Sequence, residues 1–425
     1  MDRRHPPARR PVPDERPVQA ARPVQAVRPA ATGQPTARLT VSRATAGFLD
    51  RGHPWVRPDR FTKGLERLTA GQSVTLVDER GKGLASALAD PGAEVCARVF
   101  HRQPDKAFDP QAAVERAWLR RAALHTDPTT TCYRVVHGEA DFLPGLRVER
   151  YGDVLVAVVL ADCLMPHLDG VCLALSGLLP GATVVVRDHR DDVRRSAVSS
   201  WRWQAAGGQG ALDAEAVITA HELGVPLAVR PFAGLATGIY VDQRATRAWL
   251  RPQARGARVL NLFAYTGLFS VSLLHAGAAA ALDVDLSAPA LAQARDNAAL
   301  AGVAERHRTI TGECRAVLAG LPAGELSDVV IVDPPTSAQG EGGWILRRDY
   351  PEVLGLAWAR TAPGGLLVAC CNTLHGKPFA LRDALRDACP GGQPVATPEP
   401  GIDVPLASGF PEGRPWQLAA VRRAG

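Results

Sequence analysis

The sequence predicts an α/β protein with a C-terminal Rossmann-like, doubly wound sheet, preceded by a small all-β domain and a small α/β middle domain. The first observation is residues 258–297, which follow the strand, tight turn, helix, strand, acidic residue and helix order of a βαβ unit. The second is a series of short strand patterns upstream, separated by turn residues. We expect a disordered tail over 1–38, the all-β domain over 39–107, a linker helix and the middle domain over 108–228, and the doubly wound domain over 229–425.

The first 38 residues are rich in arginine and proline. They contain eight Arg, eight Pro and three acidic residues, and they show no apolar periodicity. Such a composition cannot bury a core, so we predict disorder. The tail carries most of the net charge of +6, which leaves the rest of the chain close to neutral. The tail is either a solvated extension or an electrostatic aid to nucleic-acid binding.

Composition excludes several classes of protein. No apolar run reaches the roughly 18 uncharged residues of a membrane helix, and the start of the chain lacks an apolar signal core. We therefore expect no membrane segment and a cytoplasmic location. The eight cysteines form no C-x-x-C pair and no zinc-like spacing, so we expect reduced core cysteines and no metal.

Three segments define the first half of the chain. Residues 71–90 predict two strands around a turn, and residues 94–102 predict a third. Apolar residues at helical spacing predict a connecting helix within 108–128. Residues 133–228 then alternate between strands and a helix, with a final strand at 227–230. The charged run 187–190 is interpreted as surface charge.

The βαβ unit suggests which ligand binds. Strands are predicted at 258–263 and 278–284, a helix at 268–275, and Asp285 follows the second strand, where a carboxylate can bind both ribose hydroxyls. A dinucleotide needs G-x-G-x-x-G, but here only Gly267 is present and Tyr265 occupies a position where glycine is expected. S-adenosylmethionine has no phosphate and fits this turn better. A fold without any ligand is the remaining alternative.

A second anchor lies downstream of this unit. Residues 329–332 form a short apolar run that ends in Asp333-Pro334-Pro335. Two prolines cannot continue a strand ladder, so they stiffen a loop at the carboxyl edge of the sheet. Such a loop can hold a flat base beside a methyl donor.

These segments together resemble a known family. The matching pieces are RGHPWV (51–56), YRVVHGEADFLPGLRVERYGD (133–153), TGIYVDQRATR (237–247), NLFAYTG (261–267), DVDLS (283–287) and DPP (333–335). In this order they resemble class I S-adenosylmethionine-dependent 23S rRNA methyltransferases with an N-terminal PUA domain. The resemblance implies that residues 39–107 form a PUA-like RNA-binding domain, that residues 229–425 form the methyltransferase domain, and that RNA, most simply 23S rRNA, is the partner. For Trp55, core packing is favoured over base stacking, and a homodimer is left open.

The resemblance also implies which residues bind the cofactor. They are Tyr240, Asp242, Gln243, Arg244, Asn261, Phe263, Ala264, Tyr265, Thr266, Gly267, Asp285, Glu313 and Asp333. Ala236 replaces a lysine that is common in the family. Asp242 and Arg244 could instead cap the following helix, and Glu313, our candidate for the adenine amino group, could be a helix N-cap.

The acceptor atom depends on a short segment after Gly364-Gly365. Methylation of cytosine at carbon 5 needs a thiolate that adds to carbon 6. An ungapped count places Asn372 where the family has this cysteine, and Cys371 lies one residue early, on the other face of a strand. Thr336 and Asn372 agree instead with the guanine-N7 branch, which needs only positioning.

We therefore predict an RNA base methyltransferase whose candidate catalytic residues are Asp333, Pro334, Pro335, Asn372 and Cys371. Guanine N7 is slightly favoured over cytosine carbon 5. Amino-group methylation is less consistent, because Thr336 cannot stack on a base. A non-catalytic RNA-binding or ribosome-assembly protein with the same fold is the main alternative, and an NAD-dependent dehydrogenase is disfavoured by the missing glycines.

Overall fold

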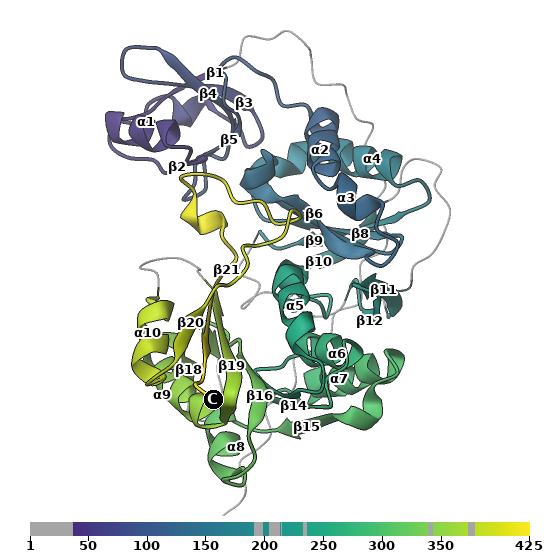
Figure 1. Cartoon of the computed structure of the whole chain (residues 1–425). Coiled ribbons are helices and arrows are strands. Elements are labelled where there is room, and N and C mark those ends of the chain that lie inside the picture. The colour runs from purple at the N-terminus through teal and green to yellow at the C-terminus, as the bar shows by residue number, and fades with distance from the viewer. Residues whose placement is uncertain are drawn as a thin grey trace, which may run out of the picture.

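The computed structural model describes residues 37–190, 199–203, 213, 215–232, 236–338, 343–372 and 379–425 (Figure 1). Residues 1–36 of the predicted tail, and most of the Gly-rich connection at 203–215, lie outside the described residues. Within the described part of the chain, no helix is long and apolar enough to cross a membrane.

The N-terminal domain is built on a five-stranded sheet with the order β1-β3-β4-β5-β2. Its strands are β1 (Ala37–Thr40), β2 (Trp55–Val56), β3 (Ser73–Val77), β4 (Gly83–Ala89) and β5 (Ala97–His101). β1 thus takes in two residues that the predicted tail had included. The all-β expectation missed helix α1 (Arg43–Asp50), which Ser42 caps by accepting a hydrogen bond from the backbone N–H of Thr45.

The middle domain has a second five-stranded sheet with the order β10-β9-β8-β7-β6. The strands are β6 (Cys132–His137), β7 (Leu146–Tyr151), β8 (Val154–Val159), β9 (Thr183–Asp188) and β10 (Ser199–Trp203). Its helices are α2 (Pro110–Leu119), α3 (Ala122–His125) and α4 (Leu168–Leu178). The single predicted connecting helix is therefore two helices. The interpretation of residues 187–190 as surface charge is wrong for Arg187, whose side chain is only 1% exposed.

The C-terminal domain contains a seven-stranded sheet with the order β15-β14-β13-β16-β19-β21-β20. Neighbouring strands are parallel from β15 to β19, and β21 is antiparallel to both β19 and β20. The strands are β13 (Arg258–Leu262), β14 (Ala280–Asp285), β15 (His307–Thr311), β16 (Ser327–Val332), β19 (Thr361–Asn372), β20 (Gln393–Val395) and β21 (Trp416–Arg422).

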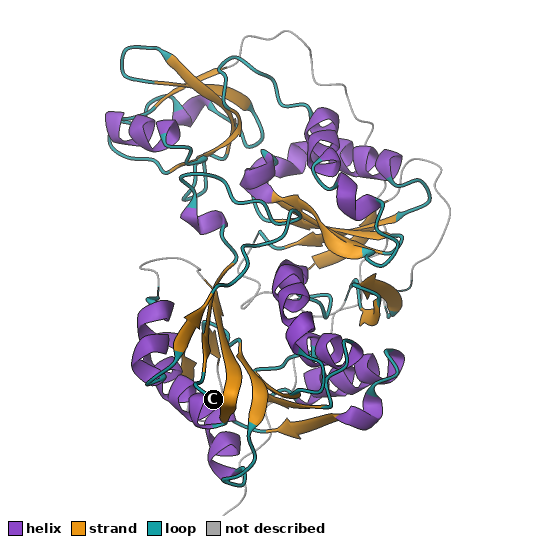
Figure 2. Cartoon of the chain, in the orientation of Figure 1, coloured by secondary structure: helices purple, strands orange, loops and turns teal. Residues whose placement is uncertain are grey.

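Helices cover both faces of this sheet, as expected for a doubly wound fold (Figure 2). They are α5 (Arg244–Leu250), α6 (Leu268–His275), α7 (Ala288–Leu300), α8 (Cys314–Gly320), α9 (Leu346–Ala359) and α10 (Leu381–Ala388). A hairpin of β11 (Ile218–Glu222) and β12 (Val225–Val229) precedes them. The predicted fold class is confirmed.

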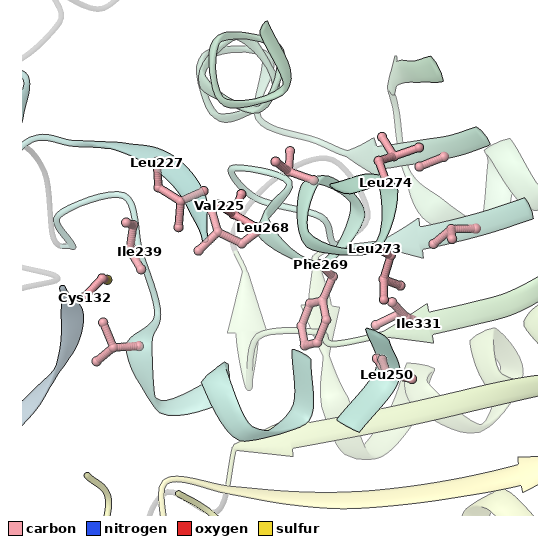
Figure 3. Close-up of a cluster of buried hydrophobic side chains, with 14 of the residues drawn as sticks. Cys132, Val225, Leu227, Ile239, Leu250, Leu268, Phe269, Leu273, Leu274 and Ile331 are labelled. Atoms are coloured by element: carbon pink, nitrogen blue, oxygen red, sulfur yellow. The ribbon is translucent and has the colours of Figure 1, made fainter. Parts of the chain in front are cut away.

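One buried cluster joins the middle and C-terminal domains. Figure 3 shows Cys132 of β6 in the same cluster as Leu227 of β12, Leu250 of α5 and Phe269 of α6. These side chains are all less than one tenth exposed. Because the face of the middle sheet is covered by the C-terminal domain, the two domains share a hydrophobic core.

A long connection between β20 and β21 links the C-terminal domain to the other two. This segment, residues 396–415, is called the strap. It runs from the C-terminal sheet towards the middle and N-terminal domains, and it is the yellow loop near β2 and β6 in Figure 1. Near its end, the ring of Phe410 packs edge-on against Trp55, with 4.8 Å between ring centroids. Trp55 also donates to Glu139 at 2.9 Å, so it serves packing between domains.

Candidate active site at the carboxyl edge of the sheet

The site lies where the strand order reverses. β13 has β14 on one side and β16 on the other, so this is the switch point at which ligands bind in open α/β sheets. The turn at 263–267 follows β13, and Asp333 follows β16. The two motifs found in the sequence therefore lie next to each other at the carboxyl edge.

The turn after β13 has an unusual backbone. Phe263 and Tyr265 have left-handed φ angles of 58° and 52°, and Gly267 has a φ of 72°. Non-glycine residues in this region cost energy and occur mainly where the surrounding structure fixes them, often at functional sites. The turn is held from one side by Thr266, whose hydroxyl donates to the carbonyl of Gly238 at 2.6 Å.

A buried carboxylate supports the turn from below. Asp283 accepts hydrogen bonds from Asn261 Nδ2 at 2.9 Å and from Ser270, and it lies 2.7 Å from His307 Nε2. Asp283 is 0% exposed and Asn261 is 1% exposed. The structure thus places Asn261 beneath the turn, with its amide donating to Asp283. A Cβ atom on Gly267 would lie 2.5 Å from Asp283 Oδ2, which explains the glycine there.

Asp285 ends β14 beside this turn. Its Oδ2 accepts from the backbone N–H of Tyr265 at 2.8 Å, and its Oδ1 accepts from the N–H of Ser287 at 2.8 Å. Each carboxylate oxygen keeps a second lone pair. Asp285 is half-buried and fixed in orientation, so it can still accept from two ribose hydroxyls. Together with the bulky turn, this pair of acceptor oxygens fits S-adenosylmethionine better than a diphosphate.

The segment before α5 forms another wall of the site. The ring of Tyr240 lies 5.3 Å from the ring of Tyr265, and Arg247 Nη2 donates to the carbonyl of Tyr240 at 2.9 Å. Gln243 is buried and accepts from Thr246 at 2.7 Å. Asp242 and Arg244 do not cap α5, because the N-cap position is Gln243 and no side chain makes the cap hydrogen bond. Asp242 instead lies 3.7 Å from Arg134 of the middle domain.

Glu313 and Phe263 lie further along the edge. Glu313 is the N-cap of α8: its carboxylate accepts from the N–H of Ala316 at 3.0 Å and from Arg315 Nε at 2.9 Å. Its contact with adenine stays a prediction. Phe263 packs against Trp344, with ring centroids 4.9 Å apart. Ala264, within the turn, is buried.

Asp333 sits at the end of β16 in an unusual environment. Burial, and then the nearby carboxylate of Asp242, raise its pKa from 3.8 to about 7. The following Pro334 is buried, while Pro335 is exposed and its carbonyl accepts from Trp344 Nε1 at 2.6 Å. Thr336 Oγ1 is buried and has no hydrogen-bond partner among the described residues. This loop therefore presents a carboxyl group that is near half-ionisation at neutral pH.

Sequence reasoning missed two aromatic residues that hold this loop. Trp344 anchors Pro335, as described, and the hydroxyl of Tyr350 lies 2.9 Å from the carbonyl of Val332 and 2.6 Å from that of Cys370. Tyr350 thus ties together the ends of β16 and β19. Both residues are buried aromatics near α9, and no local pattern in the sequence distinguishes them from ordinary core residues.

The structure separates the two candidates for contact with the base. β19 continues through Asn372, so no loop re-aims Cys371 as its use as a nucleophile would require. Cys371 is 0% exposed and packs in the cluster that contains Tyr350, and burial, with Asp333, raises its thiol pKa to about 12. Asn372 is exposed, one residue along the strand, and is paired with Trp416 of β21. By strand alternation, the two side chains lie on opposite faces.

Within the residues that the structure describes, no group of three or more His, Cys, Asp or Glu side chains is placed to hold a metal ion. All eight cysteines are buried and free. The prediction of reduced core cysteines therefore agrees with the structure.

Comparisons with known proteins agree with this geometry. Residues 201–398 match the family model described as S-adenosylmethionine-dependent methyltransferase, and residues 39–102 match that of a PUA-like domain. Over 391 residues the chain is 30% identical to "Ribosomal RNA large subunit methyltransferase I" of Shewanella denitrificans, covering 88% of this chain and 96% of that protein. It is 32% identical over 370 residues to "Ribosomal RNA large subunit methyltransferase" of Deinococcus radiodurans, covering 83% and 89%.

A solved structure shares the whole architecture. The crystal structure of SMU.776 complexed with SAH superposes with a TM-score of 0.77, covering 91% of this chain and 100% of that one. At 19% identity, the similarity shows a common fold of all three domains.

Proposed function

This chain belongs to the PUA-domain, S-adenosylmethionine-dependent family of ribosomal RNA large subunit methyltransferase I, and from that premise we propose that it methylates a base of large-subunit rRNA. The relatives named for this activity are matched over nearly their whole length, including 96% of the Shewanella protein. The observation that carries the proposal is that two features, Asp285 and the Asp333-Pro334-Pro335 loop, lie at the same switch point of the sheet. The first would hold a ribose and the second a base.

The cofactor pocket is assigned to the chain's own residues as follows. S-adenosylmethionine supplies, when bound, an electrophilic methyl group on its sulfonium. Asp285 would hold the ribose, because both of its oxygens are oriented by backbone N–H groups. The turn at 263–267 and the segment 240–244 would enclose the methionine part. With the cofactor bound, the rings of Tyr240 and Tyr265 would help to shield the methyl group from water.

For the acceptor, a ring nitrogen such as guanine N7 is supported over cytosine carbon 5. Covalent addition to cytosine needs a thiolate, and Cys371 is buried with its pKa raised to about 12, so the thiol keeps its proton at neutral pH. Asn372 is exposed and can both donate and accept hydrogen bonds at a base edge. A nitrogen lone pair needs only positioning next to the methyl group.

Asp333 would position the base. With its pKa raised to about 7, this carboxyl group can donate a hydrogen bond when protonated and accept one when ionised. The prolines that follow hold its backbone rigid, and Trp344 fixes the loop through the carbonyl of Pro335. A preorganised loop lowers the entropic cost of placing the acceptor atom in line with the methyl group.

The substrate test is mass spectrometry of rRNA from a strain that lacks this protein. One methylated nucleotide of large-subunit rRNA should disappear. It should return with the wild-type chain and return poorly with Asp285→Ala. An unchanged modification pattern would refute the proposed substrate.

The acceptor test is single-turnover methyl transfer to this unmodified rRNA. Cys371→Ser should retain most activity, and Asn372→Ala should lose most of it. Full loss in Cys371→Ser beside near-normal Asn372→Ala would assign the cytosine-5 mechanism instead. Identification of the methylated atom by fragmentation of the product provides an independent answer.

The alternative is an RNA-binding or ribosome-assembly protein that keeps the methyltransferase fold. Ala236, in place of the family's common lysine, favours it. Calorimetry with S-adenosylmethionine distinguishes the two, because an assembly factor of this kind would show no cofactor binding.

A further inference from the structure

The strap makes contacts with all three domains. In the N-terminal domain, its Glu412 lies 3.3 Å from His53 Nε2. In the middle domain, His137 Nε2 lies 2.9 Å from the strap carbonyl of Gly413. In the C-terminal domain, Asp403 forms an ion pair with Arg244. A segment far along the chain from each of these partners therefore fixes their relative positions.

Asp403 is the most buried charge of the strap. It is 1% exposed, and its carboxylate faces the guanidinium of Arg244, which approaches through both Nη2 and Nε. Its Oδ2 also lies 3.4 Å from the backbone N–H of Arg134 in β6, and its carbonyl accepts from Arg121 Nη2 at 2.9 Å. A buried carboxylate needs such partners, since an unpaired charge in this environment is strongly unfavourable.

The strap backbone is shaped to bring this pair together. Gly401 passes so close that a Cβ atom there would lie 2.5 Å from Asp403 Oδ1 and 2.7 Å from Arg244 Nη2. Only a glycine leaves room for the ion pair without a shift of both side chains. The pair is thus part of a tightly packed junction, unlike the pair of Arg414 with Glu399 on the same strap, where the Glu399 side chain is 72% exposed.

Arg244 is the last residue of the 240–244 wall and the first residue of α5. Its side chain is 11% exposed, and its guanidinium is directed to the strap. The same segment is tied to the residue that follows the strap, since Trp416 Nε1 at the start of β21 donates to the carbonyl of Asp242 at 3.1 Å. The position of this wall therefore depends on the strap, although Arg244 and Asp403 are 159 residues apart in the chain.

We propose that Asp403 is a positioning residue for the cofactor, holding the 240–244 wall in place through Arg244. This inference rests on the proposed function, in which that wall encloses the methionine part of S-adenosylmethionine. It also assigns Arg244 a supporting role: its cation serves the strap and sets the start of α5. Asp403 itself touches neither cofactor nor RNA.

The test compares two carboxylates of the same strap. Asp403→Ala should raise the Kd for S-adenosylmethionine by about tenfold or more, the consequence of losing a charge-assisted hydrogen bond that orders the site. Asp403→Asn, which keeps an oxygen facing Arg244, should lie between this variant and the wild type. Glu412→Gln, whose pair with His53 reaches the N-terminal domain instead, should leave the Kd unchanged.

Gly401→Ala is a second route to the same effect, because it wedges the pair apart without removing a charge. It should weaken cofactor binding in a protein that remains folded, as judged by circular dichroism. Affinity for unmodified large-subunit rRNA, measured by filter binding, should stay within about twofold of the wild type for Asp403→Asn, since Asp403 is only 1% exposed and offers no surface to RNA.

Several outcomes overturn the inference. Unchanged cofactor affinity in folded Asp403→Asn and Gly401→Ala would exclude a positioning role, and equal losses in Asp403→Ala and Glu412→Gln would assign the effect to the strap as a whole. If Asp285→Ala abolishes cofactor binding while the Asp403 variants bind normally, the inference fails and the proposed function stands. If the wild-type chain binds no cofactor, the proposed function fails.

Discussion

Asp333→Asn should change how the stability of the C-terminal domain depends on pH. The folded protein raises the pKa of this carboxyl from 3.8 to about 7, chiefly by burial. The unfolded chain therefore loses this proton at a lower pH than the folded chain. The free energy of unfolding is highest below about pH 4, where both states are protonated, and it falls as pH rises to about 7. At about 1.4 kcal/mol for each tenfold change, ionised Asp333 lowers the free energy of unfolding by about 4 kcal/mol at most.

Asparagine cannot ionise, so the variant avoids this loss. Its gain in unfolding free energy over the wild type should be roughly 2.5 kcal/mol larger at pH 8 than at pH 5. The assay is urea unfolding at several pH values, followed by tryptophan fluorescence, to which Trp344 beside this loop contributes. Asp296→Asn, on the exposed surface of α7, is the matched control and should show no such difference. Parallel pH profiles for wild type and Asp333→Asn would refute the buried-carboxyl argument.

Three further substitutions test the site and its support. Asp285→Ala should weaken S-adenosylmethionine binding by about 1.5–3 kcal/mol in calorimetry, and a folded variant with unchanged affinity would remove Asp285 from the ribose site. Gly267→Ala should lower the unfolding free energy by about 2 kcal/mol or more, because its φ is 72° and the new Cβ would meet Asp283 Oδ2 at 2.5 Å; a neutral result in urea unfolding would contradict this. Arg247 Nη2 and Glu222 Oε2 are 2.7 Å apart, and both side chains are only 2% exposed. Arg247→Met should therefore lower the free energy of unfolding by about 3–5 kcal/mol, because it leaves the Glu222 carboxylate buried and unpaired. Adding Glu222→Gln to the same chain should recover much of this loss.

The sequence was sufficient to predict β13, β14 and β16 because these strands are apolar runs that end at turn residues, but it did not predict β20 or β21 at the edge of the sheet. The helix predicted at 268–275 is α6, and the strand predicted at 258–263 is β13 within one residue. The helix α1 was missed, because it is short and only Leu49 within it is buried. The break between α2 and α3 was missed because it depends on distant contacts: Arg121 is 0% exposed and binds Asp141 through two hydrogen bonds of 2.7 Å.

Only part of the site could be predicted from the sequence. The turn and Asp333 follow strands directly, so their places at the carboxyl edge could be read from strand order. The environment of Asp333 could not, because it depends on burial by the folded chain and then on Asp242, which lies on another segment. The face of Cys371 could be expected from strand alternation, but only the continuation of β19 through Asn372 decides it. Asp403 lies in a strap without periodicity, and its contacts come from the middle and C-terminal domains.

The order of the last strands also bears on how the chain reaches its folded state. β20 comes before β21 in the chain, yet it joins the sheet through β21, which lies between it and β19. During synthesis, β20 therefore emerges before the strand that it needs, and the edge of β19 stays open until β21 arrives and pairs with it at seven positions. Open edges of this kind can pair with other chains and aggregate. Because the strap lies between these two strands in the chain, β21 can pair with β19 only after the whole strap has been synthesised, so the sheet closes when the segment that contacts the other two domains is also available.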